Sequence, residues 1–228
     1  MNIDPIAYIR TDFSDKFGIP RQSGRVPALQ GRIIFEPAYR NPDALRAIDG
    51  FSHLWLLFEF SVSHRETWSA TVRPPRLGGN TRVGVFASRS PFRPNPIGLS
   101  CVKLERIEQT QNGLELIVGG VDLLDGTPIF DIKPYIPYTD CQPQAAAGYT
   151  QDTSRYRLEV TFPEDLLQKL PKEKREAVIC CLAEDPRPSY QDDPDRLYSM
   201  RFMDYDVRFH VRGGMLTVTA VDDYSFSS

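Results

Sequence analysis

The chain is 228 residues long, and its content of 41% hydrophobic and 25% charged residues is typical of a globular protein and excludes a disordered or fibrous chain. It has no run of 18 apolar residues that could cross a membrane as a helix. The net charge of −3 argues against a protein that coats nucleic acid indiscriminately. The N-terminal segment includes Asp4 and Asp12 and lacks the apolar stretch of a signal peptide, so we expect a cytoplasmic protein.

Strands dominate the first 145 residues. Asn112-Gly113 predicts a hairpin with a type I′ turn, in which both central residues take positive φ. One short helix is expected around 42–48. Strands that do not alternate with helices favour a barrel or sandwich and argue against a Rossmann-type sheet. Runs rich in Ile, Val, Phe and Leu, separated by Gly- and Pro-containing breaks, predict strands over 6–10, 31–36, 52–60, 82–87, 99–109, 114–122 and 128–133.

The last third of the chain differs in character. Residues 141–154 are poor in large apolar side chains and predict a linker or exposed loop. We expect a mainly β domain over 1–145 and a small α+β domain over 155–228. Apolar residues at helical spacing predict helices over 164–170 and 173–183, strict alternation predicts a half-buried strand over 203–212, and Gly213-Gly214 turns the chain into a second strand over 216–221.

Charge is unevenly distributed along the chain. Residues 1–148 hold 16 Lys and Arg against 15 Asp and Glu, whereas residues 149–228 hold 11 against 15. Within the first part, the segment 67–104 contains basic residues and no acidic one. Such a segment suits a phosphate or carboxylate ligand, and a solvated basic surface explains its composition equally well.

The cysteines indicate neither a disulfide framework nor a zinc site. Cys101, Cys141, Cys180 and Cys181 contain no CxxC pair, and three histidines are available to complete a metal site. Free cysteines are among the most buried residue types, so we expect these thiols to behave as small buried hydrophobic groups and expect no bound metal.

Four segments have the composition of rigid ligand-binding loops. In 88–98, three prolines in six residues fix the backbone around two arginines, two serines and an asparagine, and such a segment cannot lie in a central strand. The segment 121–140 gathers Asp, Lys and Tyr side chains between prolines, 15–24 presents Arg and Gln after a Gly and a Pro, and His64-Arg65 follows a predicted strand. The alternative interpretations are that the proline-rich segment is a stiff surface loop and that His64 is a structural histidine.

Together these segments resemble one family. FSDKFGIPRQ (13–22), SHLWLLFEF with HR (52–60 and 64–65), GVFASRSPFRPNPIGLS (84–100) and DLLDGTPIFDIKPYIPYTD (122–140) are similar to the signature blocks of the TsaA-like, or TrmO, family of S-adenosylmethionine-dependent tRNA (adenine(37)-N6)-methyltransferases. The resemblance runs in order from about residue 5 to 140, and the C-terminal part fits the longer bacterial members. It implies a single-sheet β-barrel-like methyltransferase core unlike the Rossmann fold, and a homodimer with the cofactor near the subunit interface. The implied reaction is N6-methylation of threonylcarbamoyladenosine at position 37 of tRNA.

The resemblance also implies which residues contact S-adenosylmethionine. Carboxylate acceptors suit the ribose diol, so Asp122 or Asp125 is a fitting partner. A guanidinium pairs bidentately with the methionine carboxylate, and Arg21, Arg65 and Arg89 are the candidates. The full implied set is Pro20, Arg21, Gln22, His64, Arg65, Arg89, Leu99, Asp122, Leu123, Leu124 and Asp125.

The acceptor chemistry requires a base, because the carbamoylated N6 must lose its proton when it is methylated. We expect Asp131 to be the acceptor or orienter, with Lys133 or Tyr138 positioning the base. Substrate contacts are expected from Arg93 and Asn95 to the modified nucleoside or its threonyl carboxylate, and from Arg73, Arg76 and Arg82 to tRNA phosphates.

Two other functions fit the sequence. One is a non-catalytic β-barrel module that binds a nucleotide or RNA by stacking and charge. The other is a methyltransferase that acts on a small-molecule amine. For the acidic C-terminal part, the sequence favours equally a role in bracing the barrel and a contact with tRNA through its sheet or through Tyr190 and Tyr198.

Overall fold

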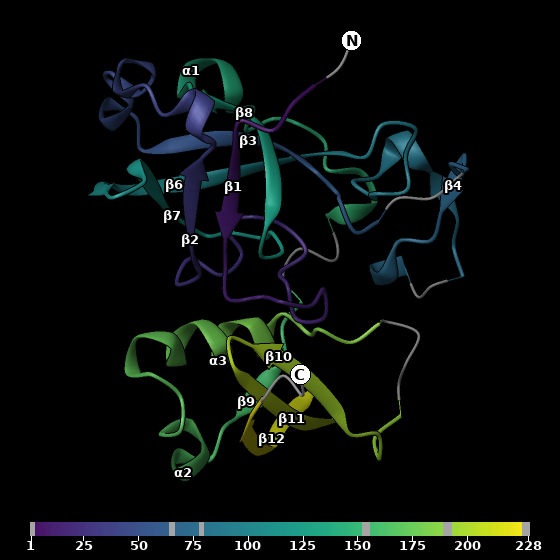
Figure 1. The fold of residues 1–228 in the computed structure, drawn as a ribbon. Helices are drawn as coiled ribbons and strands as arrows, with labels where there is room; N and C mark the ends of the chain where they lie inside the picture. Colours follow the sequence, from purple (N-terminus) through teal and green to yellow (C-terminus); the bar gives the residue numbers. More distant parts are fainter. Residues whose placement is uncertain (1–2, 64–66, 78–79, 152–155, 189–192, 225–228) are drawn as a thin grey trace.

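The structure is a computed structural model that describes residues 3–63, 67–77, 80–151, 156–188 and 193–224, except the side chain of Arg76. It has two parts, which lie one above the other in Figure 1. The upper part contains the strands from β1 to β8, and the lower part contains β9 to β12 with the helices α2 and α3.

Six antiparallel strands of the upper part pair in a closed circuit, because the last strand, β8, pairs back with β1. This arrangement confirms the mainly β, non-Rossmann fold. In the order of pairing, the strands are β1 (Ala7–Arg10), β2 (Gln30–Phe35), β7 (Gly113–Gly119), β6 (Ile97–Thr110), β3 (His53–Glu59) and β8 (Thr127–Pro134).

Side chains alternate between the inside and the outside of the barrel. In β3, Leu54 and Leu56 are fully buried, whereas Trp55 and Leu57 lie on the outer, partly exposed face. Gly98 of β6 pairs with Phe58 of β3, and a Cβ at Gly98 would lie 2.2 Å from the Phe58 ring. A side chain at this position would displace the Phe58 ring, so glycine allows the start of β6 to lie against β3.

Three local predictions in the barrel are wrong in detail. The predicted strand 82–87 is a short strand, β5 (Val83–Gly84), followed by a 3-10 turn, because Val85 turns inward and is buried. The predicted helix around 42–48 is two 3-10 turns separated by Ala47, whose φ of 66° interrupts a helix. The predicted hairpin is present, but Asn112 has no positive φ, and Gly113 takes the left-handed conformation (φ 98°) immediately after the turn.

Short elements complete the barrel part. The strand β4 (Thr71–Val72) pairs with β5, and the two form a flap beside the barrel (Figure 1). We use the name flap for the described residues from 67 to 87. The helix α1 (Pro137–Asp140) lies at the upper end of the barrel in Figure 1. Further 3-10 turns cover Pro37–Tyr39, Pro75–Leu77 and Gly148–Thr150, and one in the C-terminal part covers Lys172–Lys174.

The lower part is the expected α+β unit. Its sheet has the order β10 (Tyr198–Phe202), β11 (Tyr205–Arg212), β12 (Met215–Asp223) and β9 (Glu159–Thr161), with α2 (Glu164–Leu167) and α3 (Arg175–Ala183) beside it. The strands β11 and β12 confirm the predicted hairpin. The sequence analysis missed β9 and β10, because β9 has three residues and pairs in parallel with a strand distant in sequence.

Three further observations concern thiols, ion sites and membrane spans. Cys181 is buried and Cys101 and Cys180 are half-buried, but Cys141 is exposed, so the expectation that all thiols are buried is wrong for Cys141, which lies just after α1. Among the described residues, no group of three or more His, Cys, Asp or Glu could hold a metal ion. No helix of the part that the structure describes is long and apolar enough to span a membrane.

Candidate functional site

A large open cavity lies where the barrel, the flap and the C-terminal part meet. Its volume is about 1540 Å³, whereas pockets for small ligands typically measure about 300–1,000 Å³. The cavity therefore has room for more than one ligand group. The sequence-predicted residues that line it are Pro20, Arg21, Gln22, Arg73, Arg82, Arg89, Arg93, Leu99, Asp122, Leu123 and Leu124.

The carboxyl group of Asp122 is the most perturbed group of this cavity. Asp122 follows β7, and its carboxylate accepts a hydrogen bond from the Ser100 hydroxyl at 2.6 Å. Burial raises the pKa of Asp122 to about 6, while hydrogen bonds from Ser100 and the backbone, and the Arg89 guanidinium, oppose this rise. A largely buried acceptor in a ligand-sized cavity is a candidate for binding hydroxyl groups.

The segment 15–25 forms one wall of the cavity, and we call it the cofactor loop because the sequence analysis expects cofactor contacts from its residues 20–22. Gln22 joins this loop to the proline-rich loop, because its side-chain oxygen accepts a hydrogen bond from the Arg89 guanidinium. The side-chain amide of Gln22 in turn donates a hydrogen bond to the backbone carbonyl of Arg21 at 2.6 Å. The Ser23 hydroxyl accepts from the backbone N–H of Cys101 at 3.1 Å and ties the loop to β6. The two loops that the sequence singled out are therefore in contact.

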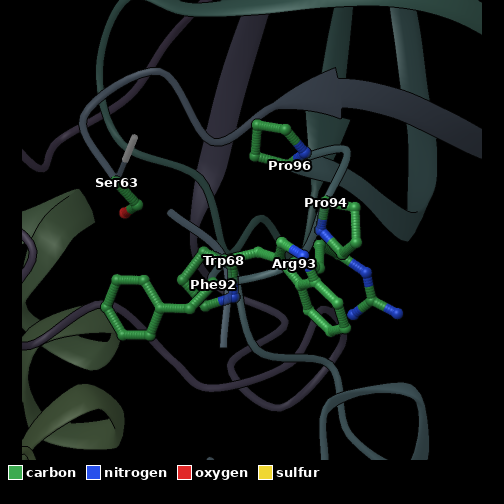
Figure 2. Close-up of a pocket in the computed structure, with 7 residues that line it drawn as sticks. Ser63, Trp68, Phe92, Arg93, Pro94 and Pro96 are labelled. Atoms are coloured by element: carbon green, nitrogen blue, oxygen red, sulfur yellow. The ribbon is translucent and has the colours of Figure 1, made fainter. Parts of the chain in front are cut away.

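The proline-rich loop 88–96 is held rigid by its own hydrogen bonds. Arg93 donates from one guanidinium nitrogen to the carbonyls of Ser88 and Ser90, both at 3.2 Å. This bonding fixes Arg93 at the edge of a smaller pocket, which Figure 2 shows together with Trp68 and Pro94. A fixed guanidinium loses little conformational freedom when it binds an anion or a planar group.

The cofactor loop also packs against the C-terminal part through polar contacts. Glu184, which is 4% exposed, forms salt bridges with Arg25 at 2.9 Å and with Arg157 at 3.1 Å. Arg21 donates to the backbone carbonyl of Arg187 at 3.1 Å. Two arginines of the cofactor loop are therefore oriented by residues more than 150 positions away in the sequence.

Apolar contacts extend this interface. Gly18, with φ of 96°, lies so close to Met200 that a Cβ would come within 2.4 Å of the Met200 sulfur. The ring of Phe17 stacks on Phe209 with a centroid distance of 6.4 Å. A side chain at position 18 would strain the backbone and collide with Met200, so this glycine sets how closely the cofactor loop approaches the C-terminal sheet.

Some predicted cofactor residues lie elsewhere. Asp125 does not line the cavity, and its carboxylate accepts hydrogen bonds from the Thr11 backbone at 2.9 Å and from Arg10 at 3.1 Å, which fastens the end of β1. His64 and Arg65 lie outside the described residues.

The predicted substrate residues divide in the same way. Arg73, Arg82 and Arg93 line the cavity, whereas Asn95 is exposed and does not. The side chain of Arg76 lies outside the described part. In the C-terminal part, Tyr198 is 5% exposed, so its predicted contact with tRNA is wrong, and Tyr190 is not among the residues described.

The three predicted catalytic residues do not line the cavity of their own chain. Asp131 and Lys133 form an ion pair at 2.6 Å on the outer face of β8, and Tyr138 of α1 is 90% exposed. The strand register relates them to the cavity, because Leu57 of β3 pairs with Leu99 on one side and with Asp131 on the other. With about 4.8 Å between strands, Asp131 lies roughly 10 Å from Leu99 on the same outer face.

The sequence analysis missed several lining residues. Ser100 occupies an inward position of β6, and an isolated inward serine in a strand is a weak signal that could have pointed to a buried polar partner. Glu184 follows α3, and nothing in its local sequence indicates that it faces Arg25. Phe86 and Lys16 also line the cavity. Trp68, which begins the flap, lines the smaller pocket beside it.

Comparison with known proteins agrees with this fold. Residues 8–141 match the tRNA-methyltransferase O N-terminal domain, and residues 155–224 match the TrmO C-terminal domain. The chain is 40% identical over 227 residues to the tRNA (adenine(37)-N6)-methyltransferase of Escherichia coli, covering 96% of this chain and 97% of that protein. It is 42% identical over 217 residues to a Pseudomonas aeruginosa protein named putative S-adenosylmethionine-dependent methyltransferase RcsF, covering 92% of each.

A solved structure supports the same assignment. The crystal structure of TrmO from Pseudomonas aeruginosa superposes with a TM-score of 0.78 at 35% identity, covering 97% of this chain and 98% of that one. The fold and cavity thus define a non-Rossmann, barrel-type methyltransferase. The chain belongs to the tRNA-methyltransferase O family, and the family predicted from the sequence motifs is confirmed.

Proposed function

We propose that this protein transfers a methyl group from S-adenosylmethionine to N6 of threonylcarbamoyladenosine at position 37 of tRNA. The observation that carries the proposal is one cavity that combines the partly buried carboxylate of Asp122, cationic side chains on two loops and a volume of about 1540 Å³. This volume suits a cofactor together with a modified base.

The residues present fit the cofactor. The Asp122 carboxylate is a hydrogen-bond acceptor suited to a ribose diol, and the adjacent Arg89 guanidinium suits a carboxylate. Leu99 and Leu124 line the same cavity and offer apolar surface to an adenine ring. When bound, S-adenosylmethionine supplies a methyl group on a positively charged sulfur.

The residues of the chain contribute mainly by positioning. The hydrogen-bonded connection between Gln22 and Arg89 holds the cofactor loop and the proline-rich loop in one arrangement. Holding two reactants in line can supply on the order of 7–11 kcal/mol of the barrier reduction. Rigid loops with few accessible conformations are suited to that role.

We assign the acceptance of the N6 proton to Asp131, with Lys133 or Tyr138 as its positioning group. Asp131 and Lys133 lie on the outer face of β8 and Tyr138 lies in α1, and none of the three lines the cavity of its own chain. The same outer face exposes Ile97 and Leu99. We therefore propose a homodimer in which this face packs against a second copy, so that Asp131 of one chain serves the cavity of the other.

The tRNA would bind along the basic rim of the cavity. Arg73 and Arg82 are exposed on the flap and suit phosphate contacts, which provide affinity but no sequence information. Arg93 suits the threonyl carboxylate. We propose a catalytic domain over 1–145 and a C-terminal domain over 155–228. The C-terminal domain would brace the cofactor loop.

The proposal is tested by incubating the protein with labelled S-adenosylmethionine and with tRNA that carries or lacks the threonylcarbamoyl group. We expect label in the modified tRNA alone. Binding of RNA without any transfer would favour a non-catalytic module. Binding of the cofactor with transfer to small amines but not to tRNA would favour a small-molecule methyltransferase.

A further inference from the structure

The flap carries an aromatic pair that neither the barrel core nor the proposed cofactor site uses. Trp68 is 51% exposed and Phe86 is 74% exposed, and their rings stack with a centroid distance of 6.3 Å and an interplanar angle of 26°. Leaving this much apolar surface in water costs free energy that burial in a core would recover. A stacked, exposed pair beside a ligand cavity therefore indicates a binding surface.

A small pocket lies against Trp68. Its other walls are Arg93, Phe92 and the prolines of the loop, as Figure 2 shows for the labelled residues. Prolines keep these walls rigid, and hydrogen bonds to Ser88 and Ser90 fix Arg93. Indole, proline and guanidinium surfaces are flat and suit the face of a planar ring.

This pocket is continuous with the large cavity. Ser63, Pro91, Phe92 and Arg93 line both, and Phe86 lines the large cavity. A ring held against Trp68 would therefore lie next to a group bound in the cavity. The segment 67–104 has no acidic residue, so a ligand with a phosphate backbone meets no repulsion from it.

We propose that Trp68, with Phe86 behind it and Arg93 beside it, forms a stacking subsite for the unpaired base of the nucleotide next to the target adenosine in the anticodon loop. Aromatic side chains in a positively charged groove are the usual means of holding unpaired bases. The proposal rests on the proposed function, and it adds a protein contact that acts on a neighbouring base and not on the modified one.

The subsite is tested with short RNA hairpins of the modified anticodon arm, one intact and two with an abasic residue on the 5′ or the 3′ side of the target adenosine. Base stacking is worth about 1–3 kcal/mol, which corresponds to roughly 5- to 150-fold in the dissociation constant. We expect Trp68→Ala to weaken binding of the intact hairpin by that factor, Trp68→Phe to recover part of it, and Phe86→Ala to weaken binding less. Tyr39→Ala, at a 43%-exposed ring that does not line either pocket, is the matched control.

The abasic hairpins distinguish stacking from a general loss of affinity. We expect the native protein to bind one of the abasic hairpins as weakly as Trp68→Ala binds the intact hairpin. We expect Trp68→Ala to bind this abasic hairpin and the intact hairpin with equal affinity. A loss in Trp68→Ala that is the same for all three hairpins, or no loss at all, overturns the subsite.

Fluorescence gives a second measurement. The chain has two tryptophans. If RNA quenches the tryptophan fluorescence of the native protein but not that of Trp68→Phe, the difference reports stacking on Trp68. Unchanged affinity for S-adenosylmethionine in Trp68→Ala shows that the variant folds and that its effect is on RNA. If the native protein transfers methyl groups to tRNA and Trp68→Ala binds RNA as tightly as the native protein, the subsite is contradicted and the proposed function stands. If the native protein neither binds nor methylates tRNA, the proposed function fails.

Discussion

At the scale of single residues, Asp122 links the stability of the fold to ligand binding. Its carboxyl group is largely buried beside Ser100, and burial raises its pKa to about 6 from an ordinary value of 3.8. Above pH 6 the native state holds a desolvated negative charge. This costs stability, and the same charge makes Asp122 a strong acceptor for a diol.

This shift predicts a specific pH dependence. Below pH 3.8 the group is protonated in both states, and between pH 3.8 and about 6 the unfolded state loses its proton first. The Asp122 contribution to the free energy of unfolding therefore falls by roughly 3 kcal/mol as pH rises through this window and stays low above it. We expect Asp122→Asn to be the more stable protein at pH 7.5 and to bind S-adenosylmethionine more weakly.

Urea unfolding of both proteins at pH 4 and pH 7.5 measures the effect, because groups common to both cancel in the difference. If the free energy of unfolding changes equally between pH 4 and pH 7.5 in the native protein and in Asp122→Asn, Asp122 is not desolvated.

The proposed catalytic role of Asp131 is tested by substitution. We expect Asp131→Ala and Asp131→Asn to lower kcat by about 10²- to 10⁴-fold, the usual contribution of a general base, with cofactor binding intact. Near-normal turnover in both variants would remove Asp131 from the mechanism.

A mixture of variants tests whether Asp131 acts across subunits. Asp131→Ala and Arg89→Ala are each expected to be inactive alone. A mixed dimer would contain one site with both native residues if Asp131 serves the opposite cavity, so mixing should restore part of the activity. No recovery, with mixed dimers demonstrated by mass, would place Asp131 in the site of its own chain.

The sequence predicted single residues unevenly. Arg21, Gln22, Arg89 and Asp122 lie in motifs whose composition already indicates rigid polar loops, and all four line the cavity. Ser100 and Glu184 could not be found in this way. Their roles come from contacts across the fold, with Asp122 and with Arg25. The inward serine at position 100 is only a weak signal, and the local sequence around Glu184 gives none.

At the scale of elements, the cofactor loop is shaped by the C-terminal part. Glu184 contacts Arg25 and Arg157 in a buried position, and Gly18 allows close approach to Met200. The C-terminal part thus orients the wall of the cavity that carries Arg21 and Gln22.

This contact predicts a positioning role for Glu184. We expect Glu184→Gln to raise the KM for S-adenosylmethionine about tenfold or more, because small displacements of a binding loop have large effects, and to leave the affinity for tRNA unchanged. Asp195→Asn is the control, because it removes the acid of an exposed ion pair with Arg212, and such pairs contribute little. An unchanged KM in Glu184→Gln would mean that the loop is held without the C-terminal part.

The elements themselves were predictable where hydrophobic runs were long. Six of the seven predicted barrel strands occur close to the expected residues, because β-branched and aromatic runs between turns determine them locally. The closure of the barrel depends on the pairing of β1 with β8, more than 110 residues apart, which no local pattern specifies. The prediction of one strand over 82–87 is wrong after Gly84, because the inward turn at Val85 depends on tertiary packing.

At the scale of the whole molecule, charge is concentrated where RNA would approach. The chain carries a net charge of −3, but Arg73, Arg82 and Arg93 gather around one cavity. Binding of tRNA should therefore depend steeply on salt in spite of the acidic average.

We expect Arg73→Ala and Arg82→Ala each to weaken tRNA binding and to reduce the slope of log K against log salt by about 1. Arg212→Ala, at an exposed arginine of the C-terminal sheet, should leave the slope unchanged. Titrations at several salt concentrations measure this. A flat dependence for the native protein would contradict the phosphate contacts.

We propose that one cavity holds both S-adenosylmethionine and the threonylcarbamoylated adenosine of tRNA. The most direct test is transfer of labelled methyl groups to tRNA with and without the threonylcarbamoyl modification, followed by nucleoside analysis of the product. We predict a single labelled product, methylated on N6 of the modified adenosine at position 37. Label elsewhere in the tRNA, or equal labelling of both tRNAs, would contradict the account.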